Sequence, residues 1–312
     1  MVRVAAVQAG SLAFDTPATM GKLETLVAAA ANHGAKLAVF PEAFVGGYPK
    51  GHAFGAVVGS RTEEGRDWYR RYHSGAIEVP GPEADRIGEV AAAHELSLVV
   101  GVVERSGGTL YCSVLFYGED GGFLGKHRKL MPTAAERLVW GFGDGSTMPV
   151  VATPVGRIGA AICWENYMPM YRTTLYSKGV QIWCAPTVDD RERWAATMQH
   201  VALEGRCFVI CASQYSVRAD YPPDYDAGYG DDPTAVLIGG GSCIVGPHGD
   251  FLVEPNHRSE AMLIAEVDIG EIARGTYDFD AVGHYARPDV FKLHVNESEQ
   301  KAVTVTEWDD EE

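Results

Sequence analysis

The chain has 312 residues, with 26 basic and 42 acidic side chains and a formal net charge of −16 at pH 7. Apolar residues account for 46% and charged residues for 22%, a balance typical of a soluble folded protein rather than a disordered one. Nucleic acids and anionic membranes are polyanions that repel so acidic a chain. We therefore expect a folded protein that binds neither nucleic acid nor a membrane surface.

No targeting segment is evident near the N-terminus, where residues 2–8 have the pattern of a strand rather than of a secretion signal. The longest nearly unbroken apolar run, 96–103, is far shorter than the roughly 20 residues of a membrane-spanning helix. The six cysteines are too sparse and too irregularly spaced for a disulfide scaffold. These features favour a cytoplasmic protein in a reducing compartment.

Strands and helices alternate along the first half of the chain. A helix is predicted where apolar residues between Leu23 and Ala30 recur at helical spacing and Gly34 ends the run. In chain order the predicted elements are a strand at 2–8, a helix at 17–33, a strand at 37–40, a helix at 83–94, and strands at 96–104, 109–117 and 122–127.

The second half continues the alternation. It predicts a strand at 157–163, a helix at 167–178, a strand at 180–185, a helix at 190–205, a strand at 207–213, two strands around the turn at 247–249, a strand at 261–267 and a short helix at 269–274. Alternating elements with hairpins among them indicate an α/β layered fold with mixed sheets.

Two stretches rich in Gly, Pro, Asp and Tyr, 46–66 and 220–233, interrupt the pattern and are predicted to be surface loops. No repeat or low-complexity linker divides the chain, so residues 1–292 are predicted to form one domain. Residues 293–312 are interpreted as a C-terminal extension that ends in an acidic tail.

Several common active-site motifs are absent from the sequence. It has no glycine-rich nucleotide-binding loop, no Gly-x-Ser-x-Gly elbow and no His-Glu-x-x-His motif, and its ten histidines are scattered singly. Cys207 and Cys211 lie four residues apart on a predicted strand and are expected to point to one face as core residues. We therefore expect neither a metal ion nor an organic cofactor.

Three reactive side chains follow predicted strands. Glu42 comes after an apolar strand and a proline, Lys129 after a basic run, and Cys163 after an apolar run. Ligands of α/β sheets bind at the carboxyl ends of strands, so this placement indicates an active site. Each residue also has a structural interpretation, because cysteines are often buried, glutamates often cap helices, and lysines in basic runs are often solvated.

The words around these residues resemble the three catalytic motifs of nitrilases, a branch of the carbon–nitrogen hydrolase superfamily. They are Phe40-Pro-Glu-Ala-Phe44, His127-Arg-Lys-Leu-Met-Pro-Thr133 and Ala160-Ala-Ile-Cys-Trp-Glu-Asn-Tyr-Met-Pro169. Further words resemble nitrilases in order and spacing, so that the resemblance covers residues 2 to about 292. It implies a four-layer α-β-β-α sandwich, a fold consistent with the predicted elements.

The resemblance also implies roles for individual residues. Cys163 matches the nucleophile, Glu42 the general base and acid, Lys129 the cation that stabilises charged intermediates, and Glu136 a glutamate that orients Lys129 or the base. Positions that border the nitrilase pocket match Tyr48, Thr133, Trp140, Trp164, Thr187 and Trp194. The family's chemistry uses no metal or organic cofactor, and its members assemble into homodimers and often into spirals.

The chemistry explains why such residues are needed. A nitrile carbon is a weak electrophile that calls for a thiolate, and Glu42 needs a pKa raised by desolvation to move the proton. Lys129 would stabilise developing negative charge and favour the Cys163 thiolate. The product would be a carboxylic acid and ammonia, by way of a thioimidate and a thioester.

Other functions stay open at this level. An amidase or carbamoylase would use the same three residues on an amide, and a cyanide-converting relative would use them on cyanide. A non-catalytic assembly protein could retain the fold, although it would not need Glu42, Lys129 and Cys163 together. The tryptophans near the expected pocket favour an aromatic or arylaliphatic nitrile, while aliphatic nitriles and dinitriles remain possible substrates.

Overall fold

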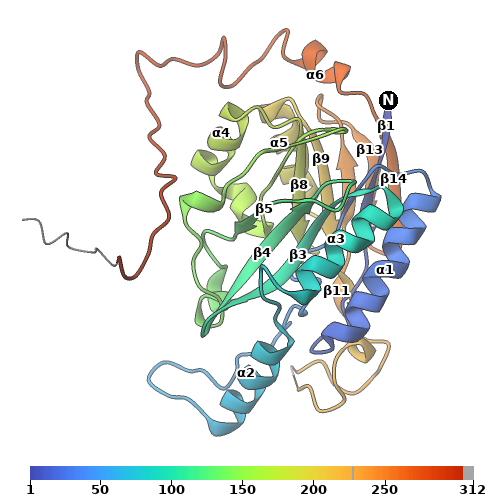
Figure 1. Cartoon of the computed structure of the whole chain (residues 1–312), viewed down its shortest axis with the longest axis vertical. Helices are drawn as coiled ribbons and strands as arrows, with labels where there is room; N and C mark the ends of the chain where they lie inside the picture. The colour runs from blue at the N-terminus through green and yellow to red at the C-terminus, as the bar shows by residue number, and fades with distance from the viewer. Residues whose placement is uncertain (227, 305–312) are drawn as a thin grey trace, which may run out of the picture.

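Two six-stranded mixed sheets form the centre of the protein in a computed structural model that describes residues 1–226 and 228–304 (Figure 1). The first sheet has the strand order β14-β1-β2-β3-β4-β5, with β1, β2 and β3 parallel and the other neighbours antiparallel. Its strands are β1 (Val2–Gln8), β2 (Leu37–Val39), β3 (Ser97–Ser106), β4 (Thr109–Tyr117), β5 (Phe123–Arg128) and β14 (Ala261–Val267).

The second sheet repeats this plan, with the order β13-β12-β9-β8-β7-β6 and with β7, β8 and β9 parallel. Its strands are β6 (Val151–Thr153), β7 (Gly156–Ala160), β8 (Ile182–Thr187), β9 (Phe208–Ser213), β12 (Ser242–Val245) and β13 (Phe251–Asn256). A separate antiparallel pair joins β10 (Tyr215–Val217) to β11 (Val236–Gly239).

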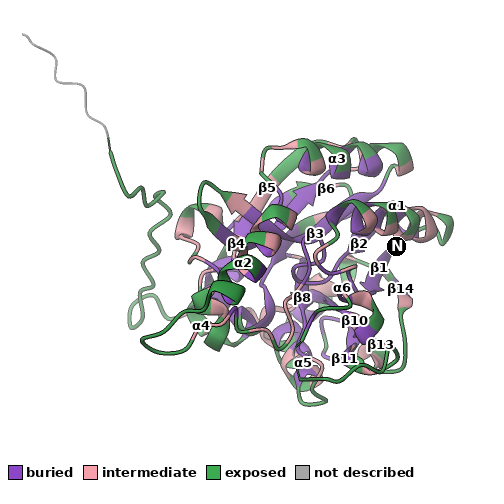
Figure 2. Cartoon of the chain, turned by 90° about the horizontal axis from the view of Figure 1, so that it is seen from below, coloured by how far each residue is buried: buried purple, intermediate pink, exposed green. Residues whose placement is uncertain are grey.

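Three buried apolar clusters define four layers. Alternate side chains of β1 point to opposite faces, so that Val4 and Ala6 pack towards the second sheet while Ala5 and Val7 pack under helices. Figure 2 shows the buried strands between helices whose outer faces are exposed. Helices α1 (Thr16–Asn32) and α3 (Pro82–His94) cover the first sheet, and α4 (Pro169–Ser177) and α5 (Trp194–Gly205) cover the second. The predicted α-β-β-α sandwich with mixed sheets is confirmed.

One helix was not predicted. Helix α2 (Glu63–Gly75) begins inside the stretch 46–66, which the sequence pattern assigned to a loop. Thr62 caps it by accepting a hydrogen bond from the Gly65 N–H at 3.0 Å. Most of its residues are charged or polar, and only a few side chains such as Trp68 and Tyr72 are buried, so the helix carries a weak apolar signal.

The strand predicted over 157–163 is also shorter than expected. Strand β7 ends at Ala160, and a short 3-10 helix, η3 (Cys163–Tyr167), begins at the cysteine itself. Helix α4 then starts at Pro169, because proline is favoured in the first turn of a helix where its missing N–H costs nothing. The predicted strands around the turn at 247–249 correspond to β12 and β13.

After the short helix α6 (Gly270–Gly275), the chain continues to residue 304 without helix or strand. It contacts the loops beside α4, where Lys178 Nζ lies 2.5 Å from a Glu297 carboxylate oxygen and the Gln300 N–H donates to Asp144. The predicted acidic tail at 307–312 lies outside the described residues. Among the helices of the described residues, none is long and apolar enough to span a membrane.

Candidate active site

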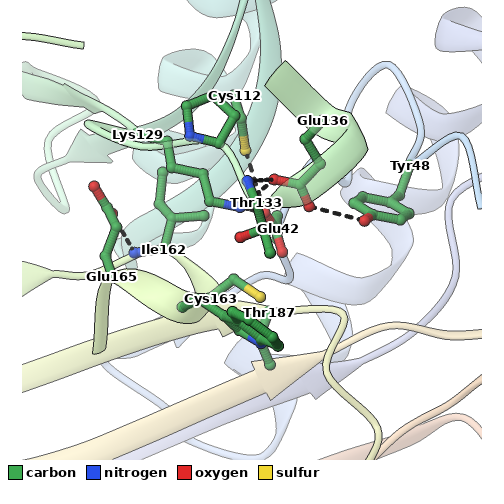
Figure 3. Close-up of polar contacts among 12 residues, drawn as sticks. Glu42, Tyr48, Cys112, Lys129, Thr133, Glu136, Ile162, Cys163, Glu165 and Thr187 are labelled. Carbon is green, nitrogen blue, oxygen red and sulfur yellow. Dashed lines mark hydrogen bonds and ion pairs between the residues drawn. The ribbon is translucent and has the colours of Figure 1, made fainter. Parts of the chain in front are cut away.

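The ends of β2, β5 and β7 bring together Glu42, Lys129 and Cys163, as the sequence predicts (Figure 3). The Glu42 segment passes very close to β3, where a Cβ atom on Gly101 would lie 2.0 Å from the Pro41 carbonyl oxygen. Only glycine leaves room for that approach. The Glu42 carbonyl accepts a hydrogen bond from Gln214 Nε2 at 2.8 Å, which holds the Glu42 backbone in place.

Lys129 is held between two carboxylates. Its Nζ lies 2.6 Å from Glu42 Oε1 and 2.7 Å from Glu136 Oε2, and all three side chains are buried or nearly so. Glu136 lies in the short 3-10 helix η1 (Ala134–Leu138) and also accepts hydrogen bonds from the Tyr48 hydroxyl at 2.8 Å and the Thr133 N–H at 2.6 Å. This arrangement agrees with the orienting role expected for Glu136.

One oxygen of the Glu42 carboxylate has no hydrogen-bond partner. Oε1 accepts from Lys129 and, at 3.6 Å, from the Cys112 thiol, whereas Oε2 is buried without a hydrogen-bond partner. A buried acceptor without a partner is costly unless something else uses it. In this position it is free to take and return a proton.

Burial raises the pKa of Glu42 most strongly. The Lys129 charge lowers that pKa, the Glu136 charge raises it, and the pKa settles at about 7. Burial alone would lower the pKa of Lys129, but the neighbouring acidic groups, Glu42 first, outweigh burial and raise it well above its usual value. Lys129 therefore stays a cation, while Glu42 exchanges a proton near neutral pH.

The backbone at Cys163 is unusual. Cys163 has φ of 51°, in the left-handed region that non-glycine residues rarely adopt, and such strain is concentrated at functional sites. The buried Asn166 side chain supports this turn, because its Nδ2 donates to the Cys163 carbonyl at 2.8 Å and to the Ala161 carbonyl at 3.0 Å. Trp183 Nε1 donates to Asn166 Oδ1 at 2.8 Å and fixes the amide in turn.

The Cys163 thiol is protonated at rest. Burial raises its pKa first, the Glu42 charge raises it further, and Lys129 and Thr187 lower it without compensating. Lys129 lowers the pKa of the thiol, as predicted, but desolvation and the nearby carboxylates raise this pKa by more. Such a thiol reacts as a nucleophile near neutral pH only with a base nearby, and Glu42 is the carboxylate close enough to influence its pKa most.

A further buried carboxylate, Glu165, was not among the predicted site residues. Glu165 accepts hydrogen bonds from His127 Nε2 at 2.9 Å, from the Leu130 N–H at 2.7 Å and from the Ile162 N–H at 2.7 Å. Through Glu165, these contacts connect His127 and Leu130, which lie on either side of Lys129, to Ile162, which precedes Cys163. No local signal in the sequence indicated this contact, because His127 lies in the basic run 126–129 and Glu165 follows 38 residues later.

Five of the six predicted pocket residues lie near this cluster. Tyr48 and Trp140 line a cavity of about 250 Å³ that Glu136 also borders, and Thr133 and Trp164 line another of about 230 Å³. Thr187, at the end of β8, is close enough to Cys163 to lower the pKa of its thiol. Figure 3 shows Tyr48, Thr133 and Thr187 around the three central residues.

The sixth predicted pocket residue, Trp194, is placed elsewhere. Its side chain is 1% exposed in the apolar cluster between α5 and the second sheet, and its Nε1 lies 3.3 Å from the Cys211 sulfur. The structure thus makes Trp194 a core residue, because α5 begins at this position and turns the indole under the helix. Cys207 and Cys211 are buried in the same cluster, as predicted.

Acidic, histidine and cysteine side chains that could bind a metal are not clustered here. Over residues 1–226 and 228–304, no group of three or more such side chains has that arrangement. The charged groups of the site instead pair with one another, as the Glu42–Lys129–Glu136 contacts show.

The comparisons with known proteins agree with this geometry. The family model of carbon-nitrogen hydrolases matches residues 3–277. The Bifunctional nitrilase/nitrile hydratase NIT4A of Lupinus angustifolius is 54% identical over 310 residues, which are 98% of this chain and 89% of that relative. Nitrilase 1 of Arabidopsis thaliana is 52% identical over 308 residues, 97% of this chain and 89% of the relative.

Solved structures share the fold at lower sequence identity. The C. elegans NitFhit protein matches with a TM-score of 0.72 and 19% identity, over 96% of this chain and 68% of that one. An amidase from Nesterenkonia AN1 matches with a TM-score of 0.66 and 18% identity, over 88% and 93% of the two chains. On the family match and the identities above 50%, the chain belongs to the carbon–nitrogen hydrolase family.

Proposed function

We propose that this protein is a nitrilase, which hydrolyses an organic nitrile to the carboxylic acid and ammonia. The observation that carries the proposal is the buried Glu42 carboxylate with one bare oxygen, placed between the Lys129 cation and the Cys163 thiol. The plant relatives named nitrilases, 52–54% identical over nearly the whole chain, support the nitrile as the substrate.

In the first step the Cys163 sulfur attacks the nitrile carbon. Glu42 takes the thiol proton on Oε2 and delivers it to the nitrile nitrogen, so that a neutral thioimidate forms. Lys129 lies where negative charge develops on the nitrogen and lowers the free energy of that transition state. The pKa of Glu42 at about 7 suits both halves of this transfer.

Hydrolysis follows in two stages. Glu42 removes a proton from a water that adds to the thioimidate and passes this proton to the nitrogen. The proton of the new hydroxyl group follows by the same route, and the tetrahedral intermediate expels ammonia to leave a thioester on Cys163. A second water, activated in the same way, releases the carboxylic acid and the thiol. The sum is one nitrile and two waters giving one acid and one ammonia.

The same tetrahedral intermediate can break down in a second way. If the Cys163 sulfur leaves instead of ammonia, one water is consumed and an amide is released. Several relatives are named bifunctional nitrilase/nitrile hydratase, which supports an amide as a second product of this protein. Proton delivery to the nitrogen favours loss of ammonia and proton delivery to the sulfur favours release of the amide, and Glu42 Oε2 is an unpaired acceptor available for either transfer.

The two cavities beside the site are bordered by apolar and aromatic side chains, among them Tyr48, Trp140 and Trp164. Such a lining favours nitriles with an aromatic or arylaliphatic substituent over strongly polar ones. Self-association into a homodimer or a larger spiral is part of the proposal. It is supported by exposed apolar side chains on the helical face, Met170 and Leu203, and along the C-terminal segment, Tyr277 and Phe291.

A product assay tests the proposal. Purified protein is incubated with phenylacetonitrile, benzonitrile, a short aliphatic nitrile, a dinitrile, cyanide and the matching amides, and ammonia, acid and amide are quantified separately. We expect ammonia and acid from at least one nitrile, with little turnover of amides. Cys163→Ala should abolish both products; activity that survives in this variant, or activity on amides alone, would overturn the proposal.

A further inference from the structure

The tryptophan after the nucleophile is exposed, unlike the others in the described chain. The Trp164 side chain is 43% exposed, while the remaining described tryptophans, Trp68, Trp140, Trp183 and Trp194, are at most 8% exposed. Half-exposed indoles are normally mobile, because few contacts oppose their rotation. Trp164 nevertheless lines the cavity of about 230 Å³ that it shares with Thr133.

A carboxylate holds this indole in place. Trp164 Nε1 donates a hydrogen bond to Asp189 Oδ2 at 2.9 Å, and Asp189, which follows β8, is 8% exposed. Burial would raise the pKa of Asp189, but hydrogen bonds from Arg191 and Trp164 outweigh burial and lower it. The acceptor is therefore an ionised group, and hydrogen bonds to ionised groups are about twice as strong as neutral ones.

Arg191 completes the contact from the other side. Its Nε donates to Asp189 Oδ1 at 2.7 Å and its Nη2 contacts Asp189 Oδ2, while the guanidinium lies 5.1 Å from the centre of the Trp164 ring. The planar fork of arginine pairs with the carboxylate and faces the indole at the same time. We call Asp189 and Arg191 the indole clamp.

The indole clamp is also connected to the nucleophile through the backbone. The Asp189 N–H donates to Thr187 Oγ1 at 2.9 Å, and Thr187 lies beside the Cys163 thiol. Trp164 itself is bonded to Cys163 in the chain. The clamp therefore fixes one wall of the cavity relative to the attacking sulfur, although neither of its side chains belongs to the Glu42–Lys129–Cys163 cluster.

We propose that the indole clamp is a positioning device that fixes Trp164 beside Cys163, so that the indole limits the size of the nitrile substituent that the site accepts. The size limit rests on the proposed nitrilase function, whereas the immobilisation of the indole does not. The substrate class that the clamp favours is a nitrile whose substituent fits beside the fixed indole, and bulkier substituents require the indole to move.

Three variants separate the parts of the clamp. Asp189→Ala removes the acceptor and the partner of Arg191, Asp189→Asn retains an acceptor oxygen but loses the charge, and Arg191→Lys retains the charge. The matched control is Asp224→Ala, because Asp224 pairs with Arg71 at 2.7 Å and Arg71 lies 4.0 Å from the Trp68 ring, the same trio of residue types outside the catalytic cluster.

The first readout needs no nitrile turnover. The alkylation rate of Cys163 is measured with small iodoacetamide and with bulky N-benzylmaleimide, by mass spectrometry of the modified peptide. In Asp189→Ala we expect the bulky-to-small rate ratio to rise about tenfold, the effect of losing one charge-assisted hydrogen bond. Asp189→Asn should be intermediate, as should Arg191→Lys, which retains the charge but loses the planar fork, whereas Asp224→Ala should stay within about threefold of the unmodified protein.

The second readout is kcat/KM for phenylacetonitrile and for its 4-tert-butyl derivative. Asp189→Ala should raise the bulky-to-small ratio about tenfold while kcat for the smaller nitrile changes less than about threefold. If the bulky-to-small ratios of alkylation and of kcat/KM in Asp189→Ala equal those in Asp224→Ala, the proposal that the clamp positions Trp164 is wrong. A changed alkylation ratio in a protein without nitrile turnover would leave the clamp standing and contradict the proposed function instead.

Discussion

Two glutamates of similar burial on opposite faces of one sheet have pKa values shifted in opposite directions. Glu42 and Glu104 are 0% and 1% exposed, and each lies beside basic residues of β5 or of its end. Every oxygen of Glu104 is used, by Lys126, Arg128 and the Ser113 hydroxyl. Burial would raise the pKa of Glu104, but hydrogen bonds from Arg128 and Lys126 outweigh burial and lower it.

Glu42 has one cation, a second carboxylate nearby and a bare Oε2, and its pKa is raised to about 7. The comparison shows that burial alone does not make a catalytic carboxylate. Complete pairing turns a buried glutamate into a structural ion, whereas incomplete pairing leaves it able to accept a proton near neutral pH. The alternating faces of β5 permit both, since Arg128 and Lys129 point to opposite sides of the sheet.

The largest expected effect is on activity. Glu42→Gln should lower kcat/KM for a nitrile by about 10³-fold or more, because general acid–base catalysis contributes about 10²–10⁴-fold. Glu104→Gln should lower kcat/KM by less than about fivefold but destabilise the fold by about 3 kcal/mol, since it breaks a buried ion network. Steady-state kinetics and urea unfolding of both variants measure these losses. Equal losses of activity in the two variants would contradict the assignment of Glu42 as catalytic and Glu104 as structural.

The next effect is the pH dependence of stability. Because the pKa of Glu42 is about 7 in the folded state and near 4.5 in the unfolded state, the unfolded chain releases this proton first and stability falls as pH rises from 4.5 to 7. Glu42→Gln removes this loss. Its free energy of unfolding relative to the unmodified protein should rise by roughly 3 kcal/mol between pH 4.5 and 8.

Glu104 should show the opposite trend. With a lowered pKa, Glu104 contributes stability above the unfolded-state pKa that is lost as pH falls through its folded-state pKa. Glu104→Gln should therefore lose more stability at pH 7 than at acidic pH. Unfolding curves over this pH range test both glutamates, and parallel trends in the two variants would contradict the comparison.

A smaller effect is expected at Glu165. Glu165→Gln keeps one acceptor oxygen but loses the charge that His127, Leu130 and Ile162 share, at a cost of about 2 kcal/mol in stability. Because these contacts position Lys129 and Cys163, kcat should fall about tenfold with little change in KM. A change in KM alone would place Glu165 in the substrate pocket instead.

The smallest effect is expected at the Tyr48 hydroxyl. Tyr48→Phe removes one hydrogen bond to Glu136, which still contacts Lys129 and the Thr133 N–H. We expect kcat/KM to fall about three- to tenfold, in line with one hydrogen bond of about 1 kcal/mol. Steady-state kinetics with the same nitrile provide the test, and a loss as large as that of Glu42→Gln would assign Tyr48 a role in the proton transfer.

Much of the sandwich and of the cluster was predictable because strand periodicity and motif words are local signals. Glu42, Lys129 and Cys163 follow strands in the sequence. In the first sheet β2 and β5 run in the same direction, so that Glu42 and Lys129 lie at the same edge, and the end of β7 in the second sheet brings Cys163 beside Glu42. The pairing of Glu165 with His127 was not predictable, since it joins segments 38 residues apart through a buried contact. The prediction for Trp194 was wrong because the sequence does not distinguish a tryptophan that lines a cavity from one that packs in the core.

The role of Glu42 as the base for Cys163 is tested by the pH dependence of kcat/KM for a nitrile. This quantity reports the pKa values of the free enzyme. If Glu42 is the base that activates the protonated Cys163 thiol, activity must fall as pH drops through an apparent pKa of about 7, because the carboxylate is lost there. This acidic limb should appear in the unmodified protein and in Glu104→Gln alike. An acidic limb near 4.5, the ordinary glutamate value, would contradict it.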